Sequence, residues 1–210
     1  MLSHENYTKA HINDVWIETG ADPSILERTI FAFGLLEAIR SVGLQFIFKG
    51  GTSLLLLLDE PRRLSTDIDI IVEPETNVDD YIQRAGKIFP FLSVEEHVRK
   101  GSNDIEKRHF RFHFQSPRSG KEINILLDVV FEHNPYKTVV EKPIQSSLLM
   151  NEGENLLVTV PDKNCIVCYS IAHKKFSMRI GSAESTSFQH PVSISKYDDE
   201  LFICNTDSRK

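Results

Sequence analysis

Cysteine is scarce in this 210-residue chain, which contains only Cys165, Cys168 and Cys204. Such an odd and sparse set does not make a disulfide framework and favours a reducing compartment, the cytosol. Cys165 and Cys168 form a single Cys-x-x-Cys pair with no second pair to complete a zinc site. We therefore interpret the cysteines as small apolar side chains, in preference to a metal or redox centre.

Long hydrophobic runs and an excess of basic charge are also lacking. The longest apolar run, Leu54–Leu58, is too short to cross a bilayer, and the first residues lack the basic and apolar regions of a signal peptide. The formal net charge is −6, so a contact with nucleic acid would need a local basic patch. We expect a cytoplasmic protein that does not contact a membrane.

The remaining composition, 40% apolar and 26% charged, is that of an ordinary globular domain. Residues 1–20 read as a loosely ordered lead-in with a short helix around 11–19. Apolar periodicity and turn residues predict the elements that follow. Helices are expected over 23–42, over the leucines at 54–58, over 77–89 and over 165–178; strands are expected over 44–48, 67–72, 107–115, 123–131 and 156–160.

Two carboxylates lie inside a predicted strand, in the run Asp67-Ile68-Asp69-Ile70-Ile71-Val72. Residues i and i+2 of a strand point to the same face, so Asp67 and Asp69 should project side by side. Two such carboxylates repel each other, and a divalent cation relieves the repulsion. The alternative is that both acids lie on the solvated face of an edge strand.

A third carboxylate and a glycine turn change the balance between these alternatives. Asp128 lies in the middle of the apolar strand 123–131, where an aspartate needs a partner. Gly50 and Gly51 precede a helix, where glycine allows close backbone approach and free N–H groups favour an anion. Thr52 or Ser53 can add a hydroxyl donor. The chain lacks the GxxxxGK[ST] motif of a P-loop.

Together these residues point to two-metal phosphoryl transfer. Asp67, Asp69 and Asp128 would bind two Mg²⁺ ions. The turn residues Gly50, Gly51, Thr52 and Ser53 would hold the triphosphate of an NTP. A histidine-bearing strand face, His109 with Arg111 and His113, is interpreted as a solvated face that could also touch RNA phosphates.

Two motifs joined in this order resemble the AbiEii/AbiGii-type nucleotidyltransferases of the DNA polymerase β-like superfamily. They are Lys49-Gly50-Gly51-Thr52-x-Leu54 and Arg63-x-Ser65-x-Asp67-Ile68-Asp69, and the resemblance covers about residues 22–165. The resemblance implies transfer of an NMP from an NTP to a hydroxyl, with tRNA as one known kind of acceptor and an antitoxin as partner. It also implies that Arg63 and Ser65 support the nucleotide loop, and that a helical lysine contacts the nucleotide. Lys174 is the candidate for that lysine.

We therefore predict an α/β (α+β) fold with a mixed, largely antiparallel nucleotidyltransferase sheet and helices packed on one side of it. Residues 1–165 would form the nucleotidyltransferase domain, and residues 166–210 an atypical or truncated C-terminal segment. The expected function is Mg²⁺-dependent nucleotidyl transfer by the toxin of a type IV toxin–antitoxin or abortive-infection system. The alternatives are an inactive remnant that binds nucleotide or antitoxin, and a nucleotidyltransferase that acts on a small molecule.

Overall fold

The computed structural model describes residues 1–58, 63–97 and 106–162, together with the backbone of four later strands. The helical elements are η1 (His4–Tyr7), α1 (Lys9–Thr19), α2 (Pro23–Ser41), α3 (Gly50–Leu57) and α4 (Asp79–Ala85). The first seven strands are β1 (Ile47–Lys49), β2 (Ile68–Val72), β3 (Phe91–Glu96), β4 (Lys107–Gln115), β5 (Glu122–Phe131), β6 (Val139–Pro143) and β7 (Leu157–Pro161). No described helix has the length and apolarity required to span a membrane.

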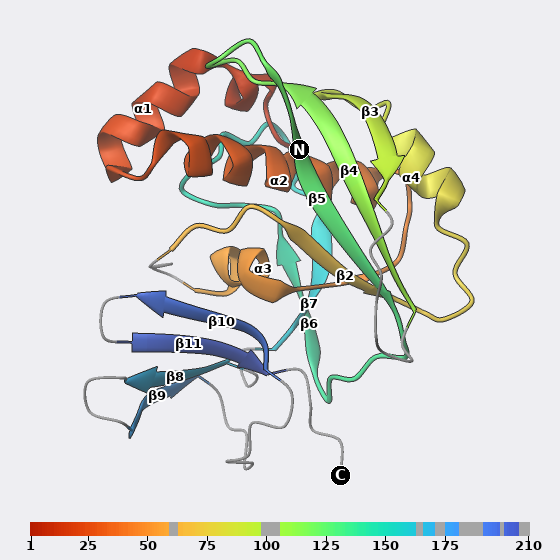
Figure 1. Cartoon of the computed structure of the whole chain (residues 1–210), viewed down its shortest axis with the longest axis vertical. Helices are drawn as coiled ribbons and strands as arrows, with labels where there is room; N and C mark the ends of the chain where they lie inside the picture. Colours follow the sequence, from red (N-terminus) through yellow and green to blue (C-terminus); the bar gives the residue numbers. More distant parts are fainter. Residues whose placement is uncertain are drawn as a thin grey trace.

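These seven strands form one sheet in the order β3-β4-β5-β2-β1-β7-β6. Two of the six neighbouring pairs are parallel, β5 with β2 and β1 with β7, and the other four are antiparallel. The prediction of a mixed, largely antiparallel sheet is therefore confirmed. The strands β4 and β5 form the predicted hairpin. In the middle of the sheet, β5 lies beside β2 (Figure 1).

The two faces of the sheet differ sharply in chemistry. On the core face, every second residue over most of β2, β4 and β5 is apolar and buried, because successive side chains of a strand point to opposite faces. All four α-helices contribute buried side chains to this same core. In Figure 1, α2 runs behind β4 and β5, and the predicted packing of helices on one side is confirmed. The opposite face, called the site face below, carries the odd-numbered residues of β2 and β4.

The longest helix, α2, begins where the sequence predicts it. The Asp22 carboxylate accepts hydrogen bonds from the backbone N–H groups of Ser24 and Ile25, and Pro23 occupies the first turn. The helix is buried on most sides, from Leu26 to Ile39, because it lies between the sheet and the N-terminal residues.

The expectation of a loosely ordered lead-in over residues 1–20 is wrong. Leu2, Tyr7, Ile12 and Val15 are all buried in the main core. Among the first fifteen residues, only these four apolar side chains pack into the core. They are too far apart in the sequence to form a short-range apolar pattern. Their burial on α2 outweighs the polar composition of the segment.

A second sheet of four strands follows the first, in the order β10-β11-β8-β9. Its strands are β8 (Ile166–Ser170), β9 (Lys175–Ile180), β10 (Pro191–Tyr197) and β11 (Glu200–Asn205). The helix predicted over 165–178 is therefore wrong, since β8 and β9 pair antiparallel there. Residues 166–169 read Ile-Val-Cys-Tyr, and such β-branched and aromatic side chains favour a strand.

Candidate active site

Four side chains form one row across the site face. Lys49 of β1 pairs with Asp69 of β2, Asp69 pairs with Asp128 of β5, and Asp128 pairs with His109 of β4. Directly paired residues of neighbouring strands project from the same face, with Cβ atoms about 5 Å apart. The sheet therefore brings together two acids that are far apart in the sequence, with a basic side chain on each flank.

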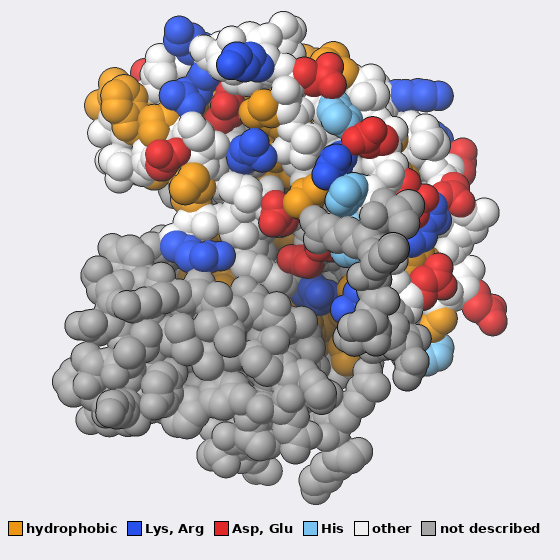
Figure 2. Space-filling view, viewed as in Figure 1, with side chains coloured by type: hydrophobic (Ala, Val, Ile, Leu, Met, Phe, Trp, Pro, Cys, Tyr) orange, Lys and Arg blue, Asp and Glu red, His pale blue; other side chains and the backbone are white. Residues whose placement is uncertain are grey.

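Figure 2 shows how the charges are distributed on the face drawn there. Acidic, basic and histidine side chains are intermixed over β4 and its neighbours. On β4, His113 lies 3.4 Å from Glu95 and 3.1 Å from Glu122, and Arg111 lies 3.6 Å from Glu95. This part of the face is neutralised internally, so it is not the local basic patch that RNA binding would need.

Two buried threonines form hydrogen bonds with the backbone of the loop that leads into β2. The Thr29 hydroxyl of α2 donates to the Ser65 carbonyl at 2.9 Å, and the Thr52 hydroxyl of α3 donates to the Asp67 carbonyl at 2.6 Å. Thr29 and Thr52 are both fully buried. Since both hydroxyls bind backbone oxygen, they fix the path of the loop and leave the exposed Asp67 side chain to project from it.

The glycine turn lies directly against the acids. Gly50 has φ +80°, in the left-handed region, and a Cβ there would collide with Asp69 Oδ2 and lie 2.9 Å from Asp69 Cγ. A Cβ on Gly51 would lie 2.9 Å from Ser65 Oγ and 3.6 Å from an Arg63 guanidinium nitrogen. The two halves of the sequence motif thus meet in space. Gly50 is required by its backbone conformation and by the close approach of Asp69, whereas a side chain at Gly51 would displace the Ser65 hydroxyl.

The Asp69 carboxyl is destabilised as an anion by its surroundings. Burial raises its pKa most, Lys49 lowers it, and the negative charges of Asp128 and Asp67 raise it further. The negative charges of Asp67 and Asp128 both act on Asp69, as expected for three acids in one region of the sheet. A bound cation would relieve this repulsion.

His109 holds the third acid in place. Its Nδ1 lies 2.7 Å from Asp128 Oδ1, and both side chains are partly buried, at 15% and 28% exposure. A carboxylate only accepts hydrogen bonds, so the ring donates through Nδ1. The bond fixes the orientation of the Asp128 carboxylate on the site face.

The family model described as nucleotidyl transferase AbiEii toxin, type IV TA system, matches residues 35–168, which is more than half of the chain. The chain belongs to the AbiEii family of nucleotidyl transferase toxins. The matched segment contains the row of four side chains and the glycine turn. A search of the curated proteins found no match.

The crystal structure of JHP933 from Helicobacter pylori is among the solved structures similar to the chain. The TM-score is 0.42 and the sequence identity 15%, over 65% of this chain and 53% of that one. The AbiEii-family chain therefore spans about half the length of the solved structure that it matches.

Two residues of this candidate site, Lys49 and His109, are not among the site residues predicted from the sequence. The sequence shows Lys49 only as part of the glycine motif and places His109 on a solvated strand face. The strict alternation over 107–115 does place His109 on the polar face, but its partner depends on the register with β5. Lys49 likewise joins the row only through the register of β1 with β2, which no short stretch of sequence specifies.

The remaining predicted nucleotide-binding residues have different positions. The Ser53 hydroxyl donates to the Gly50 carbonyl at 2.8 Å and is buried, so it closes the first turn of α3. Arg63 is exposed beside Gly51. Lys174 lies outside the described residues. Contacts of these residues with a nucleotide stay predictions.

The donor chemistry of the row suits a hard divalent cation. Within the described ranges, no three His, Cys, Asp or Glu side chains are arranged as a metal cluster. Mg²⁺ does not require one, because it is typically held by one or two carboxylates together with substrate phosphates. Asp69 and Asp128 at one level, with Asp67 preceding β2, supply such carboxylates.

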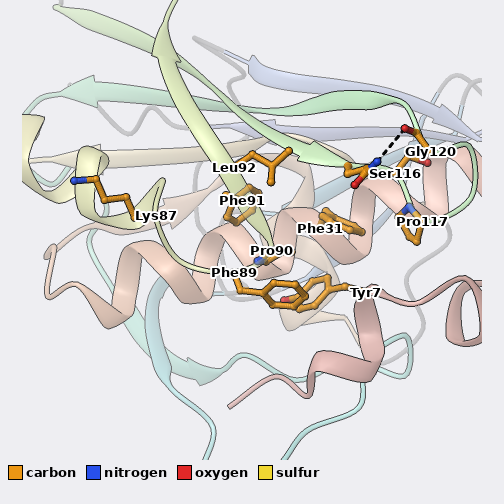
Figure 3. Close-up of a pocket in the computed structure, with 11 residues that line it drawn as sticks. Tyr7, Phe31, Lys87, Phe89, Pro90, Phe91, Leu92, Ser116, Pro117 and Gly120 are labelled. Atoms are coloured by element: carbon orange, nitrogen blue, oxygen red, sulfur yellow. Dashed lines mark hydrogen bonds between the residues drawn. The ribbon is translucent and has the colours of Figure 1, made fainter.

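A separate hollow of about 590 Å³ lies where β3 begins and β4 ends, and Figure 3 shows its lining. The lining is mostly apolar and includes Phe31, Phe89 and Leu92. The Gly120 N–H donates to the Ser116 carbonyl at its edge, at 2.8 Å. None of the predicted site residues lines this hollow.

Proposed function

We propose that this protein transfers a nucleoside monophosphate from an NTP to an acceptor hydroxyl, as the toxin of a type IV toxin–antitoxin pair acting in the cytosol. Family membership supports the class of reaction. The observation that carries the proposal is the parallel register that sets Asp69 beside Asp128 on one face. Residues 1–165 would form the catalytic unit.

Each residue then has a defined task. Asp67, Asp69 and Asp128 would hold two Mg²⁺ ions, which would neutralise the triphosphate and activate the attacking hydroxyl. The backbone at Gly50 and Gly51 would approach the phosphates, with the N–H groups of α3 directed at the anion. His109 would keep the Asp128 carboxylate in one orientation toward the metal.

We propose the 3′ end of tRNA as the acceptor, because the resemblance noted in the sequence implies tRNA as one kind of acceptor. The mixed charges of β4 supply no extended basic surface, so the acceptor would be bound mainly near the acids and their metals. An acceptor hydroxyl on a small molecule would use the same residues and is distinguished by experiment.

The test is label transfer from each of the four NTPs to bulk tRNA in the presence of Mg²⁺. Wild-type protein should label RNA with at least one NTP, and Asp67→Ala should abolish the label. Asp80→Ala is the matched control, because Asp80 is an exposed acid that pairs with Arg84 on α4, away from the proposed site. Failure of wild type to label RNA with any NTP would overturn the tRNA assignment.

A second candidate is a protein that binds nucleotide without transferring it. It is favoured by the strands β8 and β9, which stand where a lysine-bearing helix was expected. Binding of an NTP by wild type, with no transfer to RNA or to small hydroxyl compounds, would support this candidate.

A further inference from the structure

Lys49 is an unusual lysine because it is almost completely buried. Its exposure is 7%, whereas lysine is rarely buried without a partner. It lies on the site face as the cross-strand neighbour of Asp69. Lys49 is also the residue that precedes α3, and its side chain makes no capping hydrogen bond there.

The positive charge of Lys49 is not neutralised by a close contact in the described part of the chain. Asp69 is near enough to interact electrostatically, but among the described residues no ion pair or hydrogen bond joins the two side chains. The free N–H groups at the start of α3 add partial positive charge beside Lys49. The Lys49 ammonium group and the N-terminus of α3 repel each other, so an anion bound between them would be stabilised by both.

The position of the acids identifies the anion. Mg²⁺ held by one or two carboxylates is completed by substrate phosphates, so those phosphates must lie next to Asp69. Lys49 is adjacent to Asp69 across the strand pair. Lysine commonly binds phosphate as a compact point charge.

We propose that Lys49 binds the triphosphate of the donor nucleotide, an inference that rests on the proposed function. This contact uses the first sheet alone. It would supply the positive charge that sequence reasoning assigned to Lys174, which lies outside the described residues. Lys49 would thus contact substrate directly, from the strand that leads into the glycine turn.

The test is equilibrium binding of NTPs with Mg²⁺ and without acceptor, comparing wild type with Lys49→Gln, Lys49→Met and Lys49→Arg. Loss of a charged hydrogen bond should weaken triphosphate binding by about 10-fold or more in the Gln and Met variants. Binding of the corresponding NMP should change by less than about 3-fold, since the outer phosphates are absent. Lys49→Arg should retain most of the triphosphate affinity.

Lys121→Gln is the control, because Lys121 is exposed in the hairpin turn. Thermal unfolding identifies any variant that does not fold, and the Met variant retains the apolar stem if Gln is not tolerated. Unchanged triphosphate affinity in a folded Gln or Met variant would overturn the inference. Wild type that binds NTP with a Lys49-dependent affinity but transfers nothing would support the inference while contradicting the proposed function.

Discussion

The contact between Gly50 and Asp69 allows a sharp prediction for Gly50→Ala. A non-glycine residue in the left-handed region costs about 1–2 kcal/mol, and Gly50 has φ +80°. The added Cβ also collides with the Asp69 carboxylate and lies 3.1 Å from Asp69 Cβ, so rotation of the carboxylate alone does not relieve the contact. Overpacking of this kind costs about 1–3 kcal/mol more.

Gly43→Ala separates the two contributions. Gly43 has φ +90°, and a Cβ there would have no atom within 4 Å, so this control has the strain without the collision. Urea unfolding should show a loss of about 1–2 kcal/mol for Gly43→Ala. The loss for Gly50→Ala should be larger by about 1–3 kcal/mol.

A double variant tests the assigned partner. In an Asp69→Ala background the carboxylate is gone and only the contact with Cβ remains, so Gly50→Ala should cost less than it does in wild type, by up to about 1–3 kcal/mol. Equal losses for Gly50→Ala and Gly43→Ala, or additive effects of Gly50→Ala and Asp69→Ala, would refute the close approach on which the site depends.

Three further predictions follow from the site. Burial raises the pKa of Asp69, so ionisation of this carboxyl should lower the stability of the metal-free protein as pH rises above the ordinary carboxyl range. Asp69→Asn should remove that loss, as measured by urea unfolding at several pH values. The same pH dependence in wild type and Asp69→Asn would contradict this prediction. His109→Ala should weaken Mn²⁺ binding and nucleotidyl transfer by about 10- to 100-fold, because the hydrogen bond to Asp128 is lost. His109→Gln should be less affected. Equal Mn²⁺ affinities of wild type and His109→Ala would exclude the proposal that His109 orients Asp128. Thr52→Val should cost about 1–3 kcal/mol, measured by urea unfolding, because the bond to the Asp67 carbonyl is lost; a change below about 0.5 kcal/mol would be inconsistent with that anchor.

Much of the first sheet could be predicted from the sequence, because its strands have strong local signals. The alternation from Lys107 to Gln115 gives β4 its observed bounds, and the apolar run around Asp128 gives β5 to within a residue. The hairpin between them follows from the turn. The cap at Asp22 is equally local, since it depends on three consecutive residues.

The long-range parts could not be predicted in the same way. That Lys49, Asp69, Asp128 and His109 share one level depends on the register of four strands, and no short segment encodes it. One long-range prediction is confirmed, since Asp128 lies directly beside Asp69 of the Asp-x-Asp strand. It could be made because an isolated aspartate in an apolar strand requires a polar neighbour.

The C-terminal error has a different cause. Residues 165–178 have apolar positions at helical spacing, but they also include the β-branched run that forms β8. Short apolar segments fit both periods, and the pairing of β8 with β9 and β11 decides between them.

The central claim is that Asp69 and Asp128 act together in metal-dependent nucleotidyl transfer. The most direct measurement is the initial rate of label transfer from the preferred NTP, titrated with Mg²⁺, for wild type and Asp128→Asn. The account predicts Mg²⁺-dependent transfer by wild type, and a rate for a folded Asp128→Asn variant that is at least about 100-fold lower. Transfer by Asp128→Asn at the wild-type rate, with the same dependence on Mg²⁺, would contradict it.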